Sequence, residues 1–396
     1  MAQPAREEEQ LTIRRSLAAA AIAALAATWI GATPGAAAAS ADGPTASYIV
    51  SLAPGSAPAA VAGRAAGLGG RVRHVYTTAL SGFAVTLPTA QAGRLAALPG
   101  VVTVEPDRPV QLSTTQSAAT WGLDRTDQRA LPLSGTYSYT ATGAGVTAYV
   151  IDTGIELAHT DFTGRAVSGY DGVDGGSADD CNGHGTHVAG TVGGTTYGVA
   201  KRVRLVAVRV LDCTGSGTTS GVIAGIDWAT ADHQAGQPAV ANLSLGTVSS
   251  PTLDDAVSHS ISDGITYAVA AGNGNSAGVP QDACTFSPAR VEAALTVAAS
   301  DRTDAPASFS NYGSCVDLFA PGVGITSDWY TSTTATNTIS GTSMATPHVT
   351  GVAALYLQNH PRATPATVSS AVKALTTKGA IPTSRTANND LLFSNY

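Results

Sequence analysis

Short apolar segments of strand length alternate with helical segments from residue 121 to the end of this chain. The expected strands are residues 146–151, 205–211, 240–245, 265–271, 295–299 and 316–320, and the expected helices are 219–231 and 253–262. Because the strands are apolar at nearly every position, both faces of their sheet must be covered. A parallel sheet between two helical layers meets that requirement, so we predict a three-layer α/β domain. Ligands in such folds bind at the carboxyl ends of the strands.

A smaller unit, residues 45–110, precedes this domain. Its expected strands are 48–52, 71–76, 83–87 and 101–105, and its expected helices are 57–68 and 89–98. The order β-α-β-β-α-β predicts a split βαβ, or ferredoxin-like, α+β domain. The next segment, residues 111–120, is polar and has no periodicity, so we expect an exposed and cleavable linker there.

The first 41 residues have the pattern of a secretion signal. Arg14 and Arg15 precede an apolar run at residues 17–31, and small residues ending at Ala41 offer a cleavage site. A membrane anchor is the alternative, although this run is shorter than the roughly 20 residues that a span needs. The net charge of −7 and the lack of a basic block argue against a nucleic-acid partner. We therefore expect a secreted protein with no membrane attachment after processing.

Four cysteines follow the signal segment: Cys181, Cys213, Cys284 and Cys315. An even number in an oxidising compartment predicts disulfides, and three pairings are possible. A zinc site is the alternative, because Cys181 lies near His184 and His187 in sequence. The lack of a Cys-x-x-Cys pair argues against zinc.

Three residues with the chemistry of acyl transfer fall at strand ends or helix starts. Asp152 follows the strand at 146–151, His184 stands between two glycines, and Ser343 precedes an apolar helical segment. Taken singly, each has a structural explanation: an Asp that stabilises a turn, a packed His and an N-cap Ser. Together, an acid, a base and a hydroxyl form the set that activates a serine nucleophile. Their order along the chain is that of subtilisin.

Further candidates lie at neighbouring strand ends. Asn273 follows the strand at 265–271, where its amide could donate to an oxyanion or stabilise a turn. Two small-residue loops could bind an extended peptide as an added strand. These loops are Gly215, Ser216, Gly217 and Ser244, Leu245, Gly246. Pro347 is expected in the first turn of its helix, where a missing N–H is tolerated. His187 is expected to pack within its helix, and we assign no catalytic role to His348.

The segments around these residues resemble the signature blocks of the subtilisin-like serine proteases, or subtilases. The blocks are residues 150–154, 183–190 and 341–348. Segments 121–125, 180–184, 208–213 and 308–315 are similar to the proteinase K branch, and especially to its aqualysin-type bacterial members. Residues 45–110 resemble the inhibitory propeptide of the family. With the signal segment at 1–41, the resemblance implies a propeptide at 42–113 and a catalytic domain at 114–396, separated by self-cleavage near Ser113 and Thr114.

The resemblance implies a secreted serine endopeptidase that is made as a self-cleaving zymogen. Ser343 would attack the peptide carbonyl to form an acyl-enzyme, and His184 would carry the proton. Asp152 would orient the imidazole. Asn273 and the Ser343 N–H would bind the oxyanion.

The same resemblance bears on substrates and partners. Binding through main-chain groups predicts broad specificity, and Ala270, Ala271 and Gly272 leave room for an apolar or aromatic side chain before the scissile bond. Thr219 stands where the proteinase K branch carries a tyrosine, so we expect an open outer subsite. The implied partners are polypeptides and the chain's own propeptide, acting as intramolecular chaperone and inhibitor. We expect a monomer.

The resemblance also implies structural calcium and no catalytic cofactor. The ligands would be the Asp317 carboxylate and the carbonyls of Glu292 and Ala294, because oxygen ligands suit calcium. The family's disulfide pairing would be Cys181–Cys213 and Cys284–Cys315.

Two other functional classes fit parts of this pattern. A binding protein on an inactive protease scaffold would be expected to lack one member of the Asp-His-Ser set, and none is missing. An esterase or acyltransferase would use the same set of residues, and a comparison of amide and ester substrates would distinguish it.

Overall fold

The computed structural model describes residues 44–107, 114–383 and 385–396. The expected signal segment at 1–41 and the junction at Ser113 lie outside these ranges. The chain divides into two compact units, Met1–Pro109 and Val110–Tyr396, and each is described by itself.

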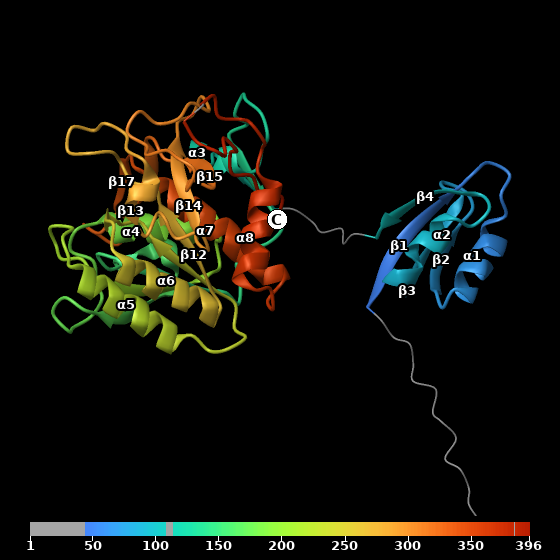
Figure 1. Ribbon diagram of the computed structural model, residues 1–396, viewed down its shortest axis with the longest axis horizontal. Helices are drawn as coiled ribbons and strands as arrows, with labels where there is room; N and C mark the ends of the chain where they lie inside the picture. Colours follow the sequence, from blue (N-terminus) through green and yellow to red (C-terminus); the bar gives the residue numbers. More distant parts are fainter. Residues whose placement is uncertain (1–43, 108–113, 384) are drawn as a thin grey trace, which may run out of the picture. The chain divides into compact units, whose positions relative to one another are not determined.

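The first unit has the split βαβ order that the sequence predicts (Figure 1). Its elements are β1 Thr45–Leu52, α1 Pro58–Gly67, β2 Arg71–Tyr76, β3 Gly82–Pro88, η1 Thr89–Gln91, α2 Ala92–Ala96 and β4 Val101–Pro106. The strands form one antiparallel sheet in the order β2-β3-β1-β4. Val50, Phe83 and Leu95 meet in a small core between the sheet and the helices. The ferredoxin-like α+β prediction is therefore confirmed.

The second unit is built on a seven-stranded parallel sheet in the order β15-β14-β12-β10-β7-β9-β8. The strands are β7 Thr147–Asp152, β8 Ala166–Asp171, β9 Arg204–Arg209, β10 Ala239–Leu243, β12 Ile265–Ala270, β14 Leu295–Ser300 and β15 Leu318–Pro321. Six of these strands were predicted from their apolar sequence. The seventh, β8, lies at the edge of the sheet and has partly exposed residues in its interior, so its sequence carries no continuous apolar run.

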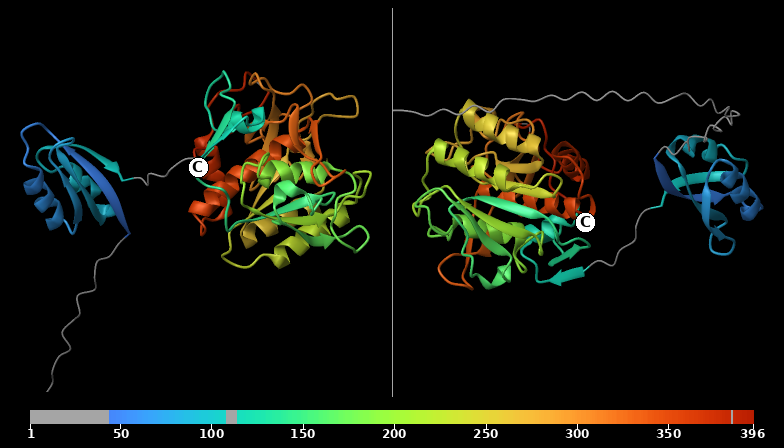
Figure 2. Two further views of the ribbon diagram at one scale, coloured as in Figure 1. Left: turned by 180° about the vertical axis from the view of Figure 1, so that it is seen from behind. Right: turned by 90° about the horizontal axis from the view of Figure 1, so that it is seen from below.

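Helices cover both faces of this sheet, as the three-layer prediction requires. One layer contains α4 His184–Gly193, α7 Thr342–Asn359 and α8 Pro365–Leu375, and the other contains α5 Thr219–Asp232 and α6 Pro251–Asp263. Figure 2 shows α5 and α6 together on one side of the strands. Consecutive residues of β7 point to opposite layers: Val150 packs in the core of α4 and α7, and Ile151 in the core of α5 and α6.

The remaining elements are short and surround the sheet. They are β5 Thr114–Ser117, α3 Trp121–Thr126, β6 Thr136–Tyr139, η2 Thr160–Phe162, β11 Thr247–Val248, η3 Ala283–Thr285, β13 Phe286–Ser287, β16 Ile325–Asp328 and β17 Thr336–Ile339. Residues 111–120 were expected to form an exposed linker; residues 114–117 of this segment form strand β5, which pairs with β6 and stays mostly exposed. The side chains of β5 are polar, so its sequence shows no apolar strand pattern. Its Thr115 hydrogen-bonds to Ser138 of β6 across the pair.

The parallel topology brings the carboxyl ends of the central strands to one edge of the sheet. Asp152 ends β7, and Asn273 follows β12 after two further residues. Among the residues that the structure describes, no helix is long and apolar enough to cross a membrane.

Candidate active site

Asp152 and His184 form a hydrogen-bonded pair at the carboxyl edge of the sheet. Asp152 is the last residue of β7, and His184 is the first residue of α4. Asp152 Oδ1 lies 2.7 Å from His184 Nδ1, and the carboxylate is fully buried. Burial alone would lower the pKa of His184, but the charge of Asp152 and its hydrogen bond raise that pKa above the ordinary value. The pair can therefore hold a proton on Nδ1 and leave Nε2 to act as a base.

Glycines bring the start of α4 close to the turn after Asp152. Gly183 has φ +109°, and a Cβ at this position would lie 2.5 Å from the Trp329 ring. A Cβ on Gly185 would lie 2.1 Å from the carbonyl oxygen of Gly154. Larger residues at either position would push His184 away from its partner, which explains why glycines flank this histidine.

Asp180 links the two segments that carry the pair, and the sequence analysis assigned it no role. Its buried Oδ1 accepts hydrogen bonds from Thr153 Oγ1 at 2.9 Å and from the Gly183 N–H at 2.9 Å. Its Oδ2 accepts from the N–H and the hydroxyl of Thr186. Asp180 therefore connects the end of β7 to the first turn of α4.

Ser343 is the second residue of α7, at the expected helix start. Its hydroxyl donates to the carbonyl of Ser244 at 3.0 Å, and no hydrogen bond to His184 is found among the described residues. The structure thus pairs Asp152 with His184, and Ser343 with Ser244. Two adjoining hollows contain these residues: one is lined by His184 and Ser244, the other by Ser244 and Ser343.

Asn273 presents a free amide group beside Ser343. Its Oδ1 accepts hydrogen bonds from the Thr342 N–H at 2.8 Å and from the Thr342 hydroxyl at 2.9 Å. These bonds orient the side chain, so its Nδ2 group is the end without an acceptor among the described residues. Asn273 and Ser343 line the same hollow. Asn311, which no sequence pattern identified, stabilises this loop by accepting a hydrogen bond from the Gly274 N–H and donating one to the Ala271 carbonyl.

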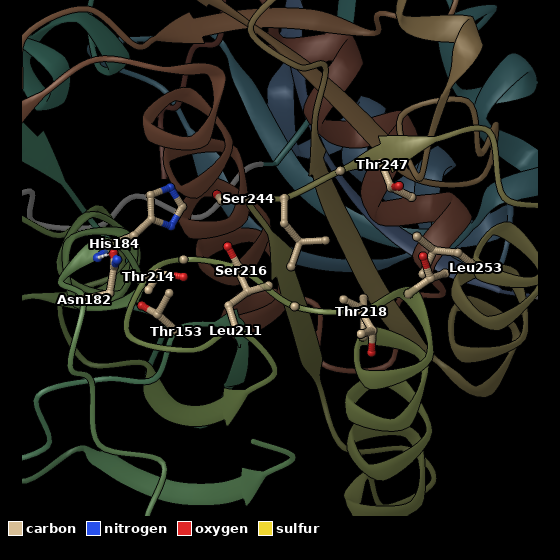
Figure 3. A pocket seen from close by; sticks show the side chains of 16 residues that line it. Thr153, Asn182, His184, Leu211, Thr214, Ser216, Thr218, Ser244, Thr247 and Leu253 are labelled. Carbon is tan, nitrogen blue, oxygen red and sulfur yellow. Dashed lines mark hydrogen bonds between the residues drawn. The ribbon is translucent and has the colours of Figure 1, made fainter. Parts of the chain in front are cut away.

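The larger hollow has a volume of about 550 Å³ and runs between the two small-residue loops (Figure 3). His184 and Asn182 lie at one end, and Thr247 and Leu253 at the other. Its lining includes Gly215, Ser216, Gly217, Thr219, Ser244, Leu245 and Gly246. The second hollow, about 280 Å³, includes Ala270, Ala271, Gly272, Phe286 and Ala289, with no charged residue in its lining. All the candidate substrate-binding residues therefore line one or both hollows.

Both disulfides expected from the resemblance are formed, Cys181–Cys213 and Cys284–Cys315. The zinc alternative is therefore wrong, because neither Cys181 nor Cys213 is a free thiolate. The first disulfide joins the segment before His184 to the loop that contains Gly215.

The two other histidines near the site have structural contacts. His187 Nε2 lies 2.9 Å from the Ile325 carbonyl, and His348 Nδ1 lies 2.9 Å from the Met344 carbonyl. Burial lowers the pKa of each to about 4. Both are therefore neutral near pH 7.

Asp317, the expected calcium ligand, contacts a cation of the protein itself. Its Oδ2 accepts from the Thr296 N–H at 2.9 Å, and its Oδ1 lies 3.1 Å from Nζ of Lys373 on α8. Burial raises the pKa of this carboxyl, and nearby Glu292 adds to the effect. Within the described ranges, no group of three or more His, Cys, Asp or Glu residues is arranged to hold a metal.

Comparisons with known proteins agree with this architecture. Residues 143–394 match the profile of the subtilase family, and residues 47–113 match the peptidase inhibitor I9 family. This chain belongs to the subtilase family. The subtilase region contains β7, α4 and α7, and the inhibitor region contains most of the first unit.

Relatives of this subtilase include bacterial serine proteases. It is 60% identical over 330 residues to an extracellular serine proteinase of Thermus sp. (strain Rt41A), covering 83% of this chain and 79% of that protein. It is 52% identical over 331 residues to alkaline serine exoprotease A of Vibrio alginolyticus, covering 82% of this chain and 60% of that protein. A crystal structure of a cold adapted subtilisin-like serine proteinase matches with a TM-score of 0.68 and 53% identity, covering 71% of this chain and 100% of that one. This subtilase is a serine protease with an N-terminal inhibitor domain.

Proposed function

We propose that this subtilase is a secreted endopeptidase of broad specificity that uses Asp152, His184 and Ser343 as its catalytic triad. The 2.7 Å contact between Asp152 and His184 carries the proposal, because it places a buried carboxylate against a partly exposed imidazole that lines the larger hollow. The helix start at Ser343 supplies the nucleophile and an N–H for a developing negative charge.

The reaction follows from the roles that these side chains can take. The Ser343 hydroxyl turns from the Ser244 carbonyl toward His184 and attacks the peptide carbonyl carbon, while His184 Nε2 takes its proton. Asp152 stabilises the imidazolium, which then protonates the leaving amine as the C–N bond breaks. Water, deprotonated by His184, attacks the acyl-enzyme and restores the Ser343 hydroxyl. The Ser343 N–H and Asn273 Nδ2 are the proposed donors to the oxyanion.

Broad specificity is supported by the lining of the two hollows. Loops 215–217 and 244–246 present main-chain groups, which bind an extended peptide regardless of its side chains. The uncharged second hollow suits an apolar or aromatic side chain before the scissile bond. Thr219 lines the first hollow and leaves the outer subsite more open than a tyrosine would.

The I9 match supports a zymogen in which the first unit acts as intramolecular chaperone and inhibitor. We place the self-cleavage between Ser113 and Thr114, at the end of the matched inhibitor region. Strand β5 begins at Thr114 and pairs with β6 of the catalytic unit, so the proposed mature N-terminus starts with ordered structure. The word "extracellular" in the name of the Thermus relative supports secretion through a signal at residues 1–41.

Structural calcium at Asp317, with the carbonyls of Glu292 and Ala294, is a further proposal. The carboxylate suits calcium in kind, since Ca²⁺ takes oxygen ligands. Lys373 occupies one carboxylate oxygen, so calcium binding requires this lysine to move aside. The Lys373 side chain is 40% exposed, which leaves it room to do so.

The decisive experiment compares the wild type with Ser343→Ala on casein, on chromogenic peptide amides and on the matching esters, with and without a serine-directed inhibitor. We expect inhibition of the wild type and no amide hydrolysis by the folded variant. Amide hydrolysis that survives in Ser343→Ala would refute the triad, and activity restricted to esters would favour the esterase alternative. Mass spectrometry of the secreted protein tests the proposed cleavage site.

A further inference from the structure

Pro347 leaves the carbonyl of the nucleophile without its helical donor. In an α-helix, the carbonyl of residue i accepts a hydrogen bond from the N–H of residue i+4. For Ser343, that residue is Pro347, which has no N–H. Pro347 is the sixth residue of α7, not part of its first turn as the sequence analysis expected, so the missing hydrogen bond is an internal one. A carbonyl left without a donor in a protein interior destabilises the local fold.

Ser244 supplies the missing donor from outside the helix. Its hydroxyl donates to the Ser343 carbonyl at 2.9 Å, while the Ser343 hydroxyl donates to the Ser244 carbonyl at 3.0 Å. Each serine side chain therefore bonds to the main chain of the other. These two bonds hold the first turn of α7 against the loop that lines both hollows.

Asn242 sets the direction of the Ser244 hydroxyl. Its Nδ2 donates to Ser244 Oγ at 2.8 Å, so the one hydrogen of that hydroxyl remains for the Ser343 carbonyl. Asn242 Oδ1 accepts from the Thr350 hydroxyl at 2.9 Å, which fixes the orientation of the amide. Asn242 lies in β10, is fully buried and lines neither hollow.

We propose that Asn242 is a positioning residue for the protease reaction, acting through Ser244 on the carbonyl that Pro347 leaves without a donor. It keeps the Ser343 hydroxyl and N–H in register with the substrate-binding loop 244–246. The inference rests on the proposed role of Ser343. Because Asn242 does not touch the hollows, its loss should lower kcat and leave KM nearly unchanged.

The test is a double-mutant cycle between Asn242→Asp and Pro347→Ala. Aspartate keeps the shape of Asn242 but has no N–H donor, so the Ser244 hydroxyl turns toward it and away from the Ser343 carbonyl. We expect kcat on a peptide amide to fall about 10- to 100-fold, since a misplacement of reacting groups by about 1 Å can cost about 10²-fold. The Pro347→Ala substitution restores an N–H at residue 347, which can donate to the Ser343 carbonyl. In that background, Asn242→Asp should therefore lower kcat by less than about threefold.

A second cycle, Ser244→Ala with Pro347→Ala, removes the donor without placing a carboxyl in the core. Ser260→Ala is the matched control, because Ser260 is a buried, hydrogen-bonded serine on α6 and touches neither hollow. It should lower Tm and leave kcat unchanged. All values are expressed per active site titrated with a serine-directed inhibitor.

Equal losses of kcat with and without the Pro347→Ala substitution, in both cycles, would overturn the inference, as would a change confined to KM. The proposed function is tested separately by Ser343→Ala. An inactive Ser343→Ala variant together with additive cycles would reject only the role of Asn242.

Discussion

The carboxyl of Asp328, at the end of β16, lies against the carboxyl of Asp161 in η2. Asp328 is fully buried, and neither of its oxygens has a donor among the described residues. A Cβ added to Gly194 would lie 2.3 Å from Asp161 Oδ2 and 3.0 Å from Asp328 Oδ2, so the two carboxyl groups lie close to each other. Two carboxylates this close cannot both ionise without strong repulsion. Burial, and then the charge of nearby Asp161, raises the pKa of Asp328 to about 8.

This pair makes the stability of the catalytic unit decrease as the pH rises from about 4 to about 8. The folded state holds the Asp328 proton up to about pH 8, whereas the unfolded chain releases it near pH 3.9. The stability that this proton gives is complete below about pH 4 and is lost as the pH rises through 8. The other groups that face Asp328 are His159, whose Nδ1 lies 3.5 Å away, Arg165 and Tyr197.

We expect Asp328→Asn to remove much of this loss. Its Tm should fall by fewer degrees between pH 6 and pH 9 than that of the wild type. The measurement is calorimetry on enzyme blocked with a serine-directed inhibitor, so that self-digestion does not distort the scan. Asp254→Asn serves as the control, because this carboxylate is paired with Arg290 elsewhere in the unit. Parallel Tm curves for the wild type and Asp328→Asn would contradict the prediction.

Asn273→Ala should lower kcat on peptide amides by about 10²- to 10³-fold, a magnitude measured for the corresponding loss in subtilisin, a relative. The reason is that Nδ2 is the free end of an amide whose Oδ1 is held by Thr342. Steady-state kinetics with a chromogenic peptide would measure the effect. Asn275→Ala, in the same loop but outside both hollows, is the control. A change in KM alone would show that Asn273 binds substrate without stabilising the oxyanion.

The acid side of the activity profile should report on His184. Catalysis needs its neutral imidazole, and Asp152 raises its pKa, so kcat/KM should fall below a midpoint higher than the ordinary value for histidine. Asp152→Asn should move the midpoint to lower pH and reduce kcat, because the charge that stabilises the imidazolium is gone. The check is kcat/KM from pH 4 to pH 9 for both proteins. Identical midpoints would mean that another group controls the profile.

The calcium proposal predicts opposite effects for two substitutions at one site. Lys373→Met removes the ammonium that competes for Asp317, so added Ca²⁺ should raise Tm more in this variant than in the wild type. Asp317→Asn should abolish the response. Thermal unfolding of inhibitor-blocked enzyme with Ca²⁺ and with a chelator measures both. If neither the wild type nor Lys373→Met responds to the chelator, Lys373 is the cation of this site and calcium is not.

Thr219→Tyr should narrow the outer subsite. An aromatic ring at the start of α5 would contact an apolar substrate side chain in the larger hollow. Selectivity for such peptides over their alanine analogues should rise about three- to tenfold in kcat/KM. Thr219→Ser is the control, since it keeps the hydroxyl and adds no surface. Unchanged selectivity in Thr219→Tyr would show that the substrate side chain of the outer subsite does not bind next to residue 219.

Much of this molecule was predictable because its signals are local. The central strands are apolar along their length, and Asp152, His184 and Ser343 each stand at the boundary of an element. Strands β5 and β8 were not predicted. Strand β5 pairs with β6 through polar residues and β8 lies at the edge of the sheet, so neither needs a continuous apolar sequence.

Residues whose roles depend on distant partners could not be predicted. Asn242 acts with Thr350, 108 positions away, and Lys373 pairs with Asp317, 56 positions away. Asp180 has the same character, because its bond to Thr153 spans 27 positions. No pattern within one segment identifies such pairs, since the fold alone brings them together.

The disulfide between Cys181 and Cys213 ties the segment before His184 to a loop that lines the larger hollow. Such a bond persists outside the cell and is reduced in a cytosol rich in glutathione. Before oxidation, the protease would therefore lack the covalent link between the segment before His184 and the loop that lines the larger hollow. In the proposed secreted protein, this covalent link would therefore form on export.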